Sequence, residues 1–181
     1  MGPPCGGKGF FKKKYLSNYH IISMSSLLSD SIKKFPEIET FQKKGELVPD
    51  QITLPILSEE LERLERSGIK KTVLDGFPRN KDQSIFIRNF DNIKFIEIKP
   101  KNKTLIERFY LRQKQEDRID NDIETFKKRL ELYHIRQPSI DEMLEGKFIL
   151  KLPDSEIKDE IKLNELERFL SSQRKAIFTT V

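Results

Sequence analysis

The sequence contains one cysteine, Cys5, and two histidines, His20 and His134, in 181 residues. A single cysteine excludes a disulfide within the chain and is typical of a protein in a reducing compartment. No apolar run approaches the roughly 20 residues that a membrane-spanning helix needs. The start, Met1-Gly2-Pro3-Pro4, also lacks the apolar segment of a secretory signal. We therefore expect a cytoplasmic protein without a membrane partner, and tethering in a larger intracellular assembly stays open.

No single sign of charge dominates the chain. It has 34 Lys and Arg against 29 Asp and Glu, a net charge of +5. The basic residues are dispersed, which argues against a nucleic-acid partner, because such a partner requires clustered basic residues with aromatics. The densest basic run, Lys12 to Lys14, is interpreted as a solvated helix face, with attraction of polyanions such as nucleotides as the alternative. The length is that of one domain, residues 1–181.

Helical and strand-like segments alternate along the chain. The apolar runs predict strands at 20–23, 71–74, 95–98 and 148–150. Helical periodicity predicts helices at 8–19, 25–33, 37–44, 50–67, 80–89, 102–112, 122–136 and 156–171, with Pro138 breaking or bending the seventh. This alternation predicts an α/β fold, with a parallel sheet and helices on both of its sides.

The sharpest local motif is at the N-terminus, where residues read Gly2-Pro3-Pro4-Cys5-Gly6-Gly7-Lys8-Gly9. Its spacing fits the phosphate loop G-x-x-x-x-G-K. Small residues let backbone N–H groups approach phosphate oxygens, and the following helix N-terminus adds positive partial charge. Lys8 would contact the β- and γ-phosphates. A Ser or Thr for Mg²⁺ usually follows the lysine, whereas this chain has Gly9. Taken alone, the run could also be a flexible N-terminus.

Further motifs follow in a fixed order. They are Lys44-Gly45-Glu46-Leu47-Val48-Pro49-Asp50, then Leu74-Asp75-Gly76-Phe77-Pro78-Arg79 with Gln83, then Arg108, Arg112, Arg118, Asp120 and Arg129. With the phosphate loop, this series resembles the adenylate kinase family of nucleoside monophosphate kinases over about residues 2–170. The six-residue step from Arg112 to Arg118 is similar to that of short-lid members, and one cysteine excludes a four-cysteine zinc lid.

The resemblance implies a three-layer α/β/α fold of the P-loop NTPase type. It also implies acceptor-binding helices at about 24–67 and a short lid at about 112–121. The implied activity is transfer of the ATP γ-phosphoryl group to AMP or another nucleoside monophosphate, with Mg²⁺ accompanying ATP. Asp75 would orient Mg²⁺ through water, and neither histidine matches a catalytic role.

The resemblance also implies a residue set for each part of the site. The ATP site would comprise Gly2, Cys5 as a small filler, Gly6, Gly7, Lys8, Gly9, Phe10, Arg112 and Arg118. The catalytic groups would be Lys8, Arg112, Arg118 and Arg129. The acceptor site would comprise Met24, Ser29, Val48, Gly76, Arg79 and Gln83.

Three departures from the family pattern stand out. The family has an apolar strand before the phosphate loop, at the centre of the sheet, and here only Met1 precedes Gly2. Such a gap would leave neighbouring strands unpaired, so the sheet rearranges, another segment or a partner chain supplies the strand, or the sequence is truncated. In the acceptor segment, Met24 replaces a Thr and Ser29 an Arg, for which Lys33 or Lys34 could partly compensate. Phe10 replaces a Thr and would crowd the α-phosphate.

Two functions therefore stay open from the sequence. The retained motif residues favour an active kinase, whose catalysis the departures would weaken. The departures in the phosphate loop and the acceptor segment, with the missing strand, favour a catalytically inactive, kinase-like structural or regulatory subunit of a larger assembly.

Overall fold

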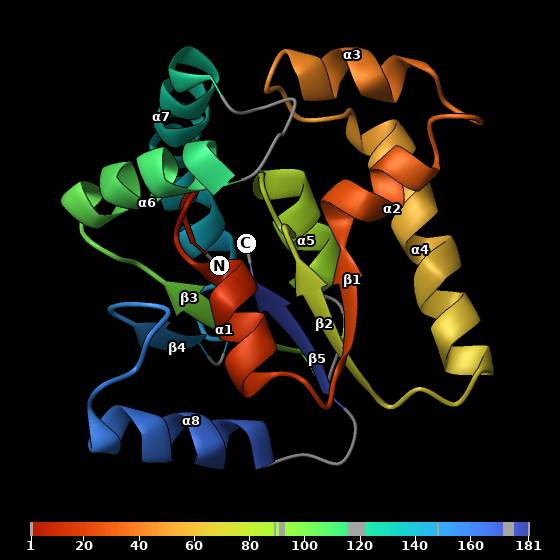
Figure 1. Ribbon diagram of the computed structural model, residues 1–181. Helices are drawn as coiled ribbons and strands as arrows, with labels where there is room; N and C mark the ends of the chain where they lie inside the picture. The colour runs from red at the N-terminus through yellow and green to blue at the C-terminus, as the bar shows by residue number, and fades with distance from the viewer. Residues whose placement is uncertain are drawn as a thin grey trace.

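A parallel sheet forms the centre of the computed structural model, which describes residues 2–88, 90, 93–115, 122–147, 149–171 and 176–180. In these residues the strands are β1 (His20–Ser23), β2 (Lys71–Asp75), β3 (Ile93–Ile98), β4 (Ile149–Leu152) and β5 (Ala176–Thr180). Their order across the sheet is β1-β2-β5-β3-β4, and every described pair is parallel (Figure 1). The expected parallel α/β fold is confirmed.

The helices follow the predicted order with shifted ends. They are α1 (Lys8–Tyr15), α2 (Met24–Asp30), α3 (Glu37–Lys43), α4 (Asp50–Arg66), α5 (Lys81–Arg88), α6 (Asn102–Gln115), α7 (Ile123–Met143) and α8 (Glu160–Ser171). The prediction that Pro138 breaks or bends the seventh helix placed its end at 136, whereas α7 runs through this proline to Met143. The proline ring is exposed, where the backbone acceptor that it leaves unpaired can reach water.

Helices cover both faces of the sheet, and β2 shows how its sequence serves both. Successive strand side chains point to opposite faces. Val73 packs with Phe11 of α1 and Leu166 of α8 in one apolar cluster. Leu74 packs with side chains of α4, α5 and α7 in another cluster. Figure 1 shows α1 in front of the sheet, α8 below it in this view, and α5 behind it.

The central position of the sheet is taken by the C-terminal segment. Strand β5 pairs with β2 from Lys71↔Ala176 to Asp75↔Thr180, and with β3 from Ile93↔Ile177 to Phe95↔Thr179. The expected unpaired neighbours are not found, because another segment of the same chain lies between them. A partner chain that completes the sheet stays a prediction.

Two smaller apolar clusters lie outside the sheet layers. One joins α3 and α4 through Ile38, Val48 and Ile56, and the other joins α6 and α7 through Phe109 and Phe126. The rings of Phe109 and Phe126 are stacked with centroids 4.5 Å apart. Most of the predicted lid, residues 116–121, lies outside the described residues. None of the described helices is both long and apolar enough to cross a membrane.

Candidate active site

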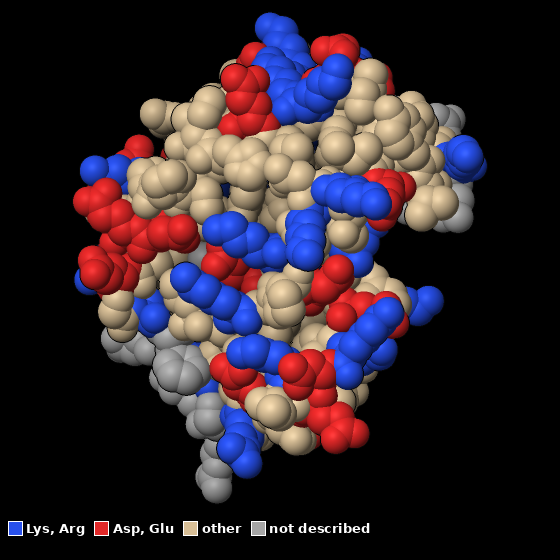
Figure 2. Space-filling view, turned by 90° about the vertical axis from the view of Figure 1, so that its left-hand side faces the viewer, with Lys and Arg blue, Asp and Glu red and all other residues tan. Residues whose placement is uncertain are grey.

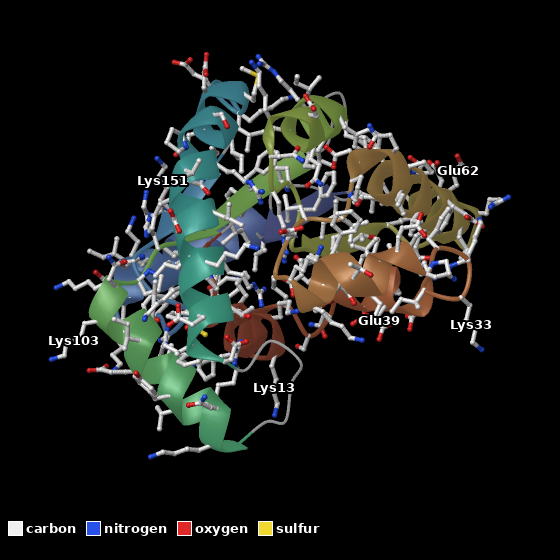
Figure 3. The ribbon with its side chains drawn as sticks, turned by 90° about the horizontal axis from the view of Figure 1, so that it is seen from above. Lys13, Lys33, Glu39, Glu62, Lys103 and Lys151 are labelled. Carbon is white, nitrogen blue, oxygen red and sulfur yellow. The ribbon has the colours of Figure 1, made fainter. Side chains whose placement is uncertain are left out.

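A cavity of about 1040 Å³ opens where the phosphate loop, the end of β2 and helices α2, α6 and α7 meet. Seen from above, α6 and α7 lie on one side and α2 to α4 on the other, and the labelled Lys33, Glu62 and Lys103 lie at the outer edge of the molecule (Figure 3). The cavity brings together every predicted site residue that the structure describes: Gly2, Cys5, Gly6, Gly7, Lys8, Gly9, Phe10, Met24, Ser29, Val48, Asp75, Gly76, Arg79, Gln83, Arg112 and Arg129. Arg118 lies outside the described residues.

The phosphate loop ends at Gly7, the N-cap residue of α1, whose φ is 84°. A Cβ at this position would lie 2.1 Å from Ser155 Oγ and 3.0 Å from Arg108 Nη1. A side chain therefore fits neither the backbone conformation nor the space. The tight loop keeps the N-terminal N–H groups of α1 facing the cavity, an arrangement suited to binding an anion.

Lys8 turns back onto the phosphate loop. Its Nζ donates to the carbonyl oxygens of Gly2 and Pro3, both at 2.9 Å. Burial lowers the pKa of Lys8 to about 7, opposed by Asp75 and assisted by the positive charges of Arg79 and Arg129. A phosphate group would give this ammonium an anionic partner and favour its charged form.

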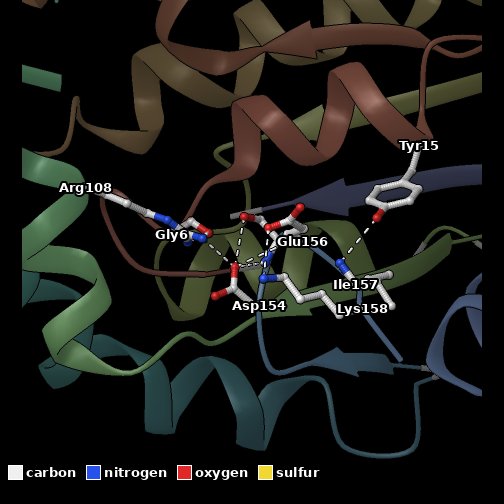
Figure 4. Close-up of polar contacts among 8 residues, drawn as sticks. Gly6, Tyr15, Arg108, Asp154, Glu156, Ile157 and Lys158 are labelled. Carbon is white, nitrogen blue, oxygen red and sulfur yellow. Dashed lines mark hydrogen bonds and ion pairs between the residues drawn. The ribbon is translucent and has the colours of Figure 1, made fainter. Parts of the chain in front are cut away.

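A polar network fixes the loop from the side of α6 and the segment after β4 (Figure 4). Arg108 donates from Nη2 to Asp154 Oδ1 at 2.6 Å and from Nη1 to the carbonyl oxygen of Gly6 at 3.3 Å. The N–H of Ser155 also donates to Asp154 Oδ1. Arg108 is at the family spacing in the sequence, but its spacing predicts no role. Asp154 was not predicted, because nothing near it in the sequence marks a site.

Asp75 ends β2 beside the loop and contacts a second lysine of α1. Its Oδ2 accepts from Lys12 Nζ, and the two side chains are 16% and 17% exposed. The described residues contain no group of three His, Cys, Asp or Glu side chains that could hold a metal ion. The role of Asp75 toward Mg²⁺ stays a prediction, and this pairing does not favour it, because a cation of the chain already occupies its carboxylate. Lys12 also differs from the predicted solvated face, since it lines the cavity.

On the predicted acceptor side, Gln83 is 3% exposed and has hydrogen bonds to three residues. Its Oε1 accepts from the N–H of Arg79 at 2.7 Å, and its Nε2 donates to Asp50 Oδ1 at 2.7 Å. Asn80 donates to the other oxygen of the same carboxylate at 2.8 Å. Gly76, with a φ of 88°, leaves room for Arg79, whose Nη2 would lie 2.8 Å from a Cβ.

The departures in the acceptor segment form their own contacts. Met24 is 3% exposed and lines the cavity. Ser29 Oγ donates to the carbonyl oxygen of Ser25 at 2.8 Å and accepts from Gln42 Nε2 at 3.2 Å. Phe10 is 48% exposed at the cavity wall, with Lys14 Nζ 5.5 Å from its ring centroid.

The two lysines expected to compensate for Ser29 do not reach the cavity. Lys33 is exposed, and Lys34 lies 3.8 Å from Glu59 Oε2. Arg136 of α7 lines the cavity instead. Its charge lowers the pKa of Arg79, after the larger effect of burial, so the two guanidinium groups are near each other. Arg136 was not predicted, because a single arginine on a charged helix does not mark a site.

The cavity wall carries a strong excess of positive charge. Among the described lining residues, seven are basic (Lys8, Lys12, Arg79, Arg108, Arg112, Arg129 and Arg136) and three are acidic (Glu46, Asp75 and Glu156). Arg112 Nε and the Tyr133 hydroxyl are buried and find no hydrogen-bond partner in the described part of the chain. Such groups fit a bound polyanion with further polar atoms.

Comparison with known proteins gives the same family as the motifs. The sequence profile described as adenylate kinase matches residues 1–147. An adenylate kinase of Borrelia garinii is 36% identical over 116 residues, 60% of this chain and 54% of the relative. An adenylate kinase of Bacteroides thetaiotaomicron is 30% identical over 154 residues, 78% of this chain and 80% of the relative.

A uridylate kinase of Saccharomyces cerevisiae is 30% identical over 158 residues, 81% of this chain and 76% of the relative. The chain thus spans about half the length of the first Borrelia relative and about three quarters or more of the other two. The family profile covers most of the chain. The phosphate loop and the arginine-lined cavity agree with this match. The chain therefore belongs to the adenylate kinase family.

Proposed function

We propose that the chain transfers the γ-phosphoryl group of ATP to a nucleoside monophosphate. The observation that carries this proposal is the single cavity wall on which the phosphate loop, Arg79 and the arginines of α6 and α7 meet. Its volume of about 1040 Å³ lies at the upper end of ordinary ligand pockets, which suits two nucleotides better than one. Family membership and relatives named adenylate and uridylate kinase support the same activity.

The proposed mechanism relies on placement and charge. Phosphoryl transfer requires two reactants in line and stabilisation of the charge on the transferring group. Lys8, released from the carbonyl oxygens of Gly2 and Pro3, would bind the phosphates of ATP. Arg112 and Arg129 would neutralise the charge that develops between the nucleotides, and Arg118 would assist from the lid. Removal of water from the closed site would limit hydrolysis of ATP.

The acceptor would lie against α2 to α5. Arg79 would bind its phosphate through two parallel hydrogen bonds. The base would face Gln83, Met24 and Val48. The side-chain amide of Gln83 is held by Asp50 and Arg79. One N–H of the amide would therefore be left to donate a hydrogen bond to the base. A buried Met in place of a hydroxyl residue removes one hydrogen-bonding group from this pocket, which argues for an acceptor base less dependent on that contact than adenine.

A phosphotransfer assay tests the proposal. The purified chain is incubated with ATP and, in turn, AMP, UMP, CMP or GMP, with and without Mg²⁺, and ADP formation is followed by ³¹P NMR. We expect turnover with at least one acceptor and its loss in Lys8→Ala. A folded protein that binds ATP without turnover on any acceptor would contradict the proposal and favour the inactive structural subunit.

The nucleic-acid alternative has little support from the surface. On the face shown in Figure 2, Lys and Arg side chains are interspersed with Asp and Glu. A protein that binds a nucleic-acid backbone concentrates its basic residues in a patch or stripe. Seven of the described basic residues line the cavity instead, where a small polyanion fits.

A further inference from the structure

Helix α1 directs two lysines into the cavity. Lys8 and Lys12 are four residues apart, so their side chains lie on the same face of the helix, and both line the cavity. Lys13 and Lys14, in contrast, are exposed. Figure 3 shows the side chain of Lys13 extending away from α1. The basic run therefore serves two purposes, and only Lys12 of its three members faces the site.

Lys12 is bound to the carboxylate that was expected to orient the metal. Its Nζ contacts Asp75 Oδ2, and both side chains are less than one fifth exposed. Solvent and salt screen such a partly buried pair less than an exposed surface pair. The contact joins α1, which follows the phosphate loop, to the end of β2, which precedes the segment that carries Arg79.

Asp75 has other cations around it. Its charge favours the protonated form of both Lys8 and Arg79, which places it close to each. One carboxylate thus faces Lys8, Lys12 and Arg79. A divalent cation bound here would have to displace Lys12 or lie beside it, at the cost of like-charge repulsion.

From this geometry we propose that Lys12 is the built-in cation of the triphosphate site, in contact with Asp75 and the phosphates of ATP, so that ATP binding does not depend on Mg²⁺. The inference rests on the proposed function in requiring that the cavity binds ATP. It adds a phosphate-binding residue outside the loop motif and assigns Asp75 to a lysine rather than to a metal-bound water.

The test is isothermal titration calorimetry with ATP alone, in excess EDTA and in excess Mg²⁺, on folded protein. For the unaltered chain we expect Kd values within about threefold of each other. Lys12→Met should raise Kd in EDTA about tenfold or more, the loss of one charge-assisted contact, and by less than about threefold in Mg²⁺, where the metal supplies the missing charge. Lys13→Met, with an exposed lysine of the same helix, should leave both values unchanged.

Asp75→Asn provides a second, independent variant. If Lys12 is the cation, this change removes a competing negative charge, and Kd in EDTA stays the same or falls. Weakening confined to Mg²⁺ would show that Asp75 holds a metal and would overturn the inference. Equal weakening of Lys12→Met in both conditions would also overturn it.

The two proposals fail in different ways. ATP binding by the unaltered chain only in Mg²⁺ would overturn the role of Lys12 and leave the proposed phosphoryl transfer standing. No ATP binding in either condition, by a chain shown to be folded, would overturn both.

Discussion

Arg108 and Asp154 join two segments that are far apart in the sequence, with Arg108 Nη2 and Asp154 Oδ1 2.6 Å apart. The same guanidinium reaches the carbonyl oxygen of Gly6. Burial raises the pKa of Asp154. The hydrogen bonds from Arg108 and from the backbone N–H of Glu156 lower it by more than burial raises it, so the pKa is below the ordinary 3.8. The ion pair therefore links helix α6 to the shape of the phosphate loop.

Arg108→Met should weaken both the stability of the chain above pH 3.8 and its binding of ATP. In the unaltered chain Asp154 contributes stability that is present above pH 3.8 and is lost as pH falls through its lower, folded-state pKa. Without Arg108 the folded-state pKa of Asp154 should rise, so the variant has less of this stability above pH 3.8 and loses less of it as pH falls. Urea unfolding from pH 3 to 7 measures the shift. Identical pH profiles for the two proteins would show that Arg108 does not stabilise the carboxylate.

Gly7→Ala should destabilise the chain by about 1–3 kcal/mol, because a left-handed conformation and a close contact both oppose a Cβ. Gly9→Ala is the matched control, since a Cβ there meets no atom within 4 Å. In a helix that change should be neutral or stabilise by up to about 1 kcal/mol. Thermal unfolding of the two variants measures the difference. Similar losses in both would place the constraint elsewhere.

ATP affinity should fall as pH rises above about 7. The pKa of Lys8 is about 7 in the empty site, so the lysine is neutral above that pH, and phosphate binding must then restore its proton. Calorimetry between pH 6 and 9, in buffers of different ionisation enthalpy, should detect proton uptake that is absent in Lys8→Met. The empty protein should also gain stability from pH 7 towards 10.5, because the unfolded chain holds the extra proton. Affinity independent of pH would contradict the lowered pKa.

Local signals sufficed to predict most of the fold. Strand β1 has the predicted bounds 20–23, and the helices appear in the predicted order. Strand β5 was not predicted, because five residues near the C-terminus show no pattern beyond short apolar content. Its place in the sheet follows from long-range pairing with β2 and β3. Periodicity within a short window does not report on such pairing.

The site was predictable where motifs are contiguous and not where the fold assembles it. Contiguous sequence motifs identified the loop from Gly2 to Gly9 and the segment from Asp75 to Arg79. Lys12 and Arg136 could not be identified in this way, because a charged side chain on a helix is exposed unless tertiary contacts direct it inward. Lys33 and Lys34 were predicted to compensate for Ser29 because they are near it in the sequence. Tertiary contacts, which decide which charge faces the cavity, cannot be read from that nearness.

A proline in β5 should destabilise the sheet, because this strand lies between β2 and β3. Ile177→Pro removes one backbone donor between β2 and β3, and a central strand tolerates such a loss poorly, at about 3 kcal/mol or more. Hydrogen exchange of the β2 and β3 amides should become faster in the variant. Unchanged exchange and stability would show that this segment is not paired with β2 and β3. A partner chain would then be the expected source of the central strand.

Arg136 should be the residue that offsets the loss of an acceptor arginine at position 29. It lines the cavity, its charge reaches Arg79, and it lies on α7, which also carries Arg129. Arg136→Met should raise KM for the monophosphate about tenfold to a hundredfold, the value of one charge-assisted contact, and change KM for ATP by less than about threefold. Adding Ser29→Arg to that variant should recover part of the loss, because the guanidinium returns from the opposite wall. Lys34→Met, the exposed alternative, should change neither constant. Equal effects of Arg136→Met on both substrates would instead place this arginine between the two nucleotides, in contact with the transferring phosphate.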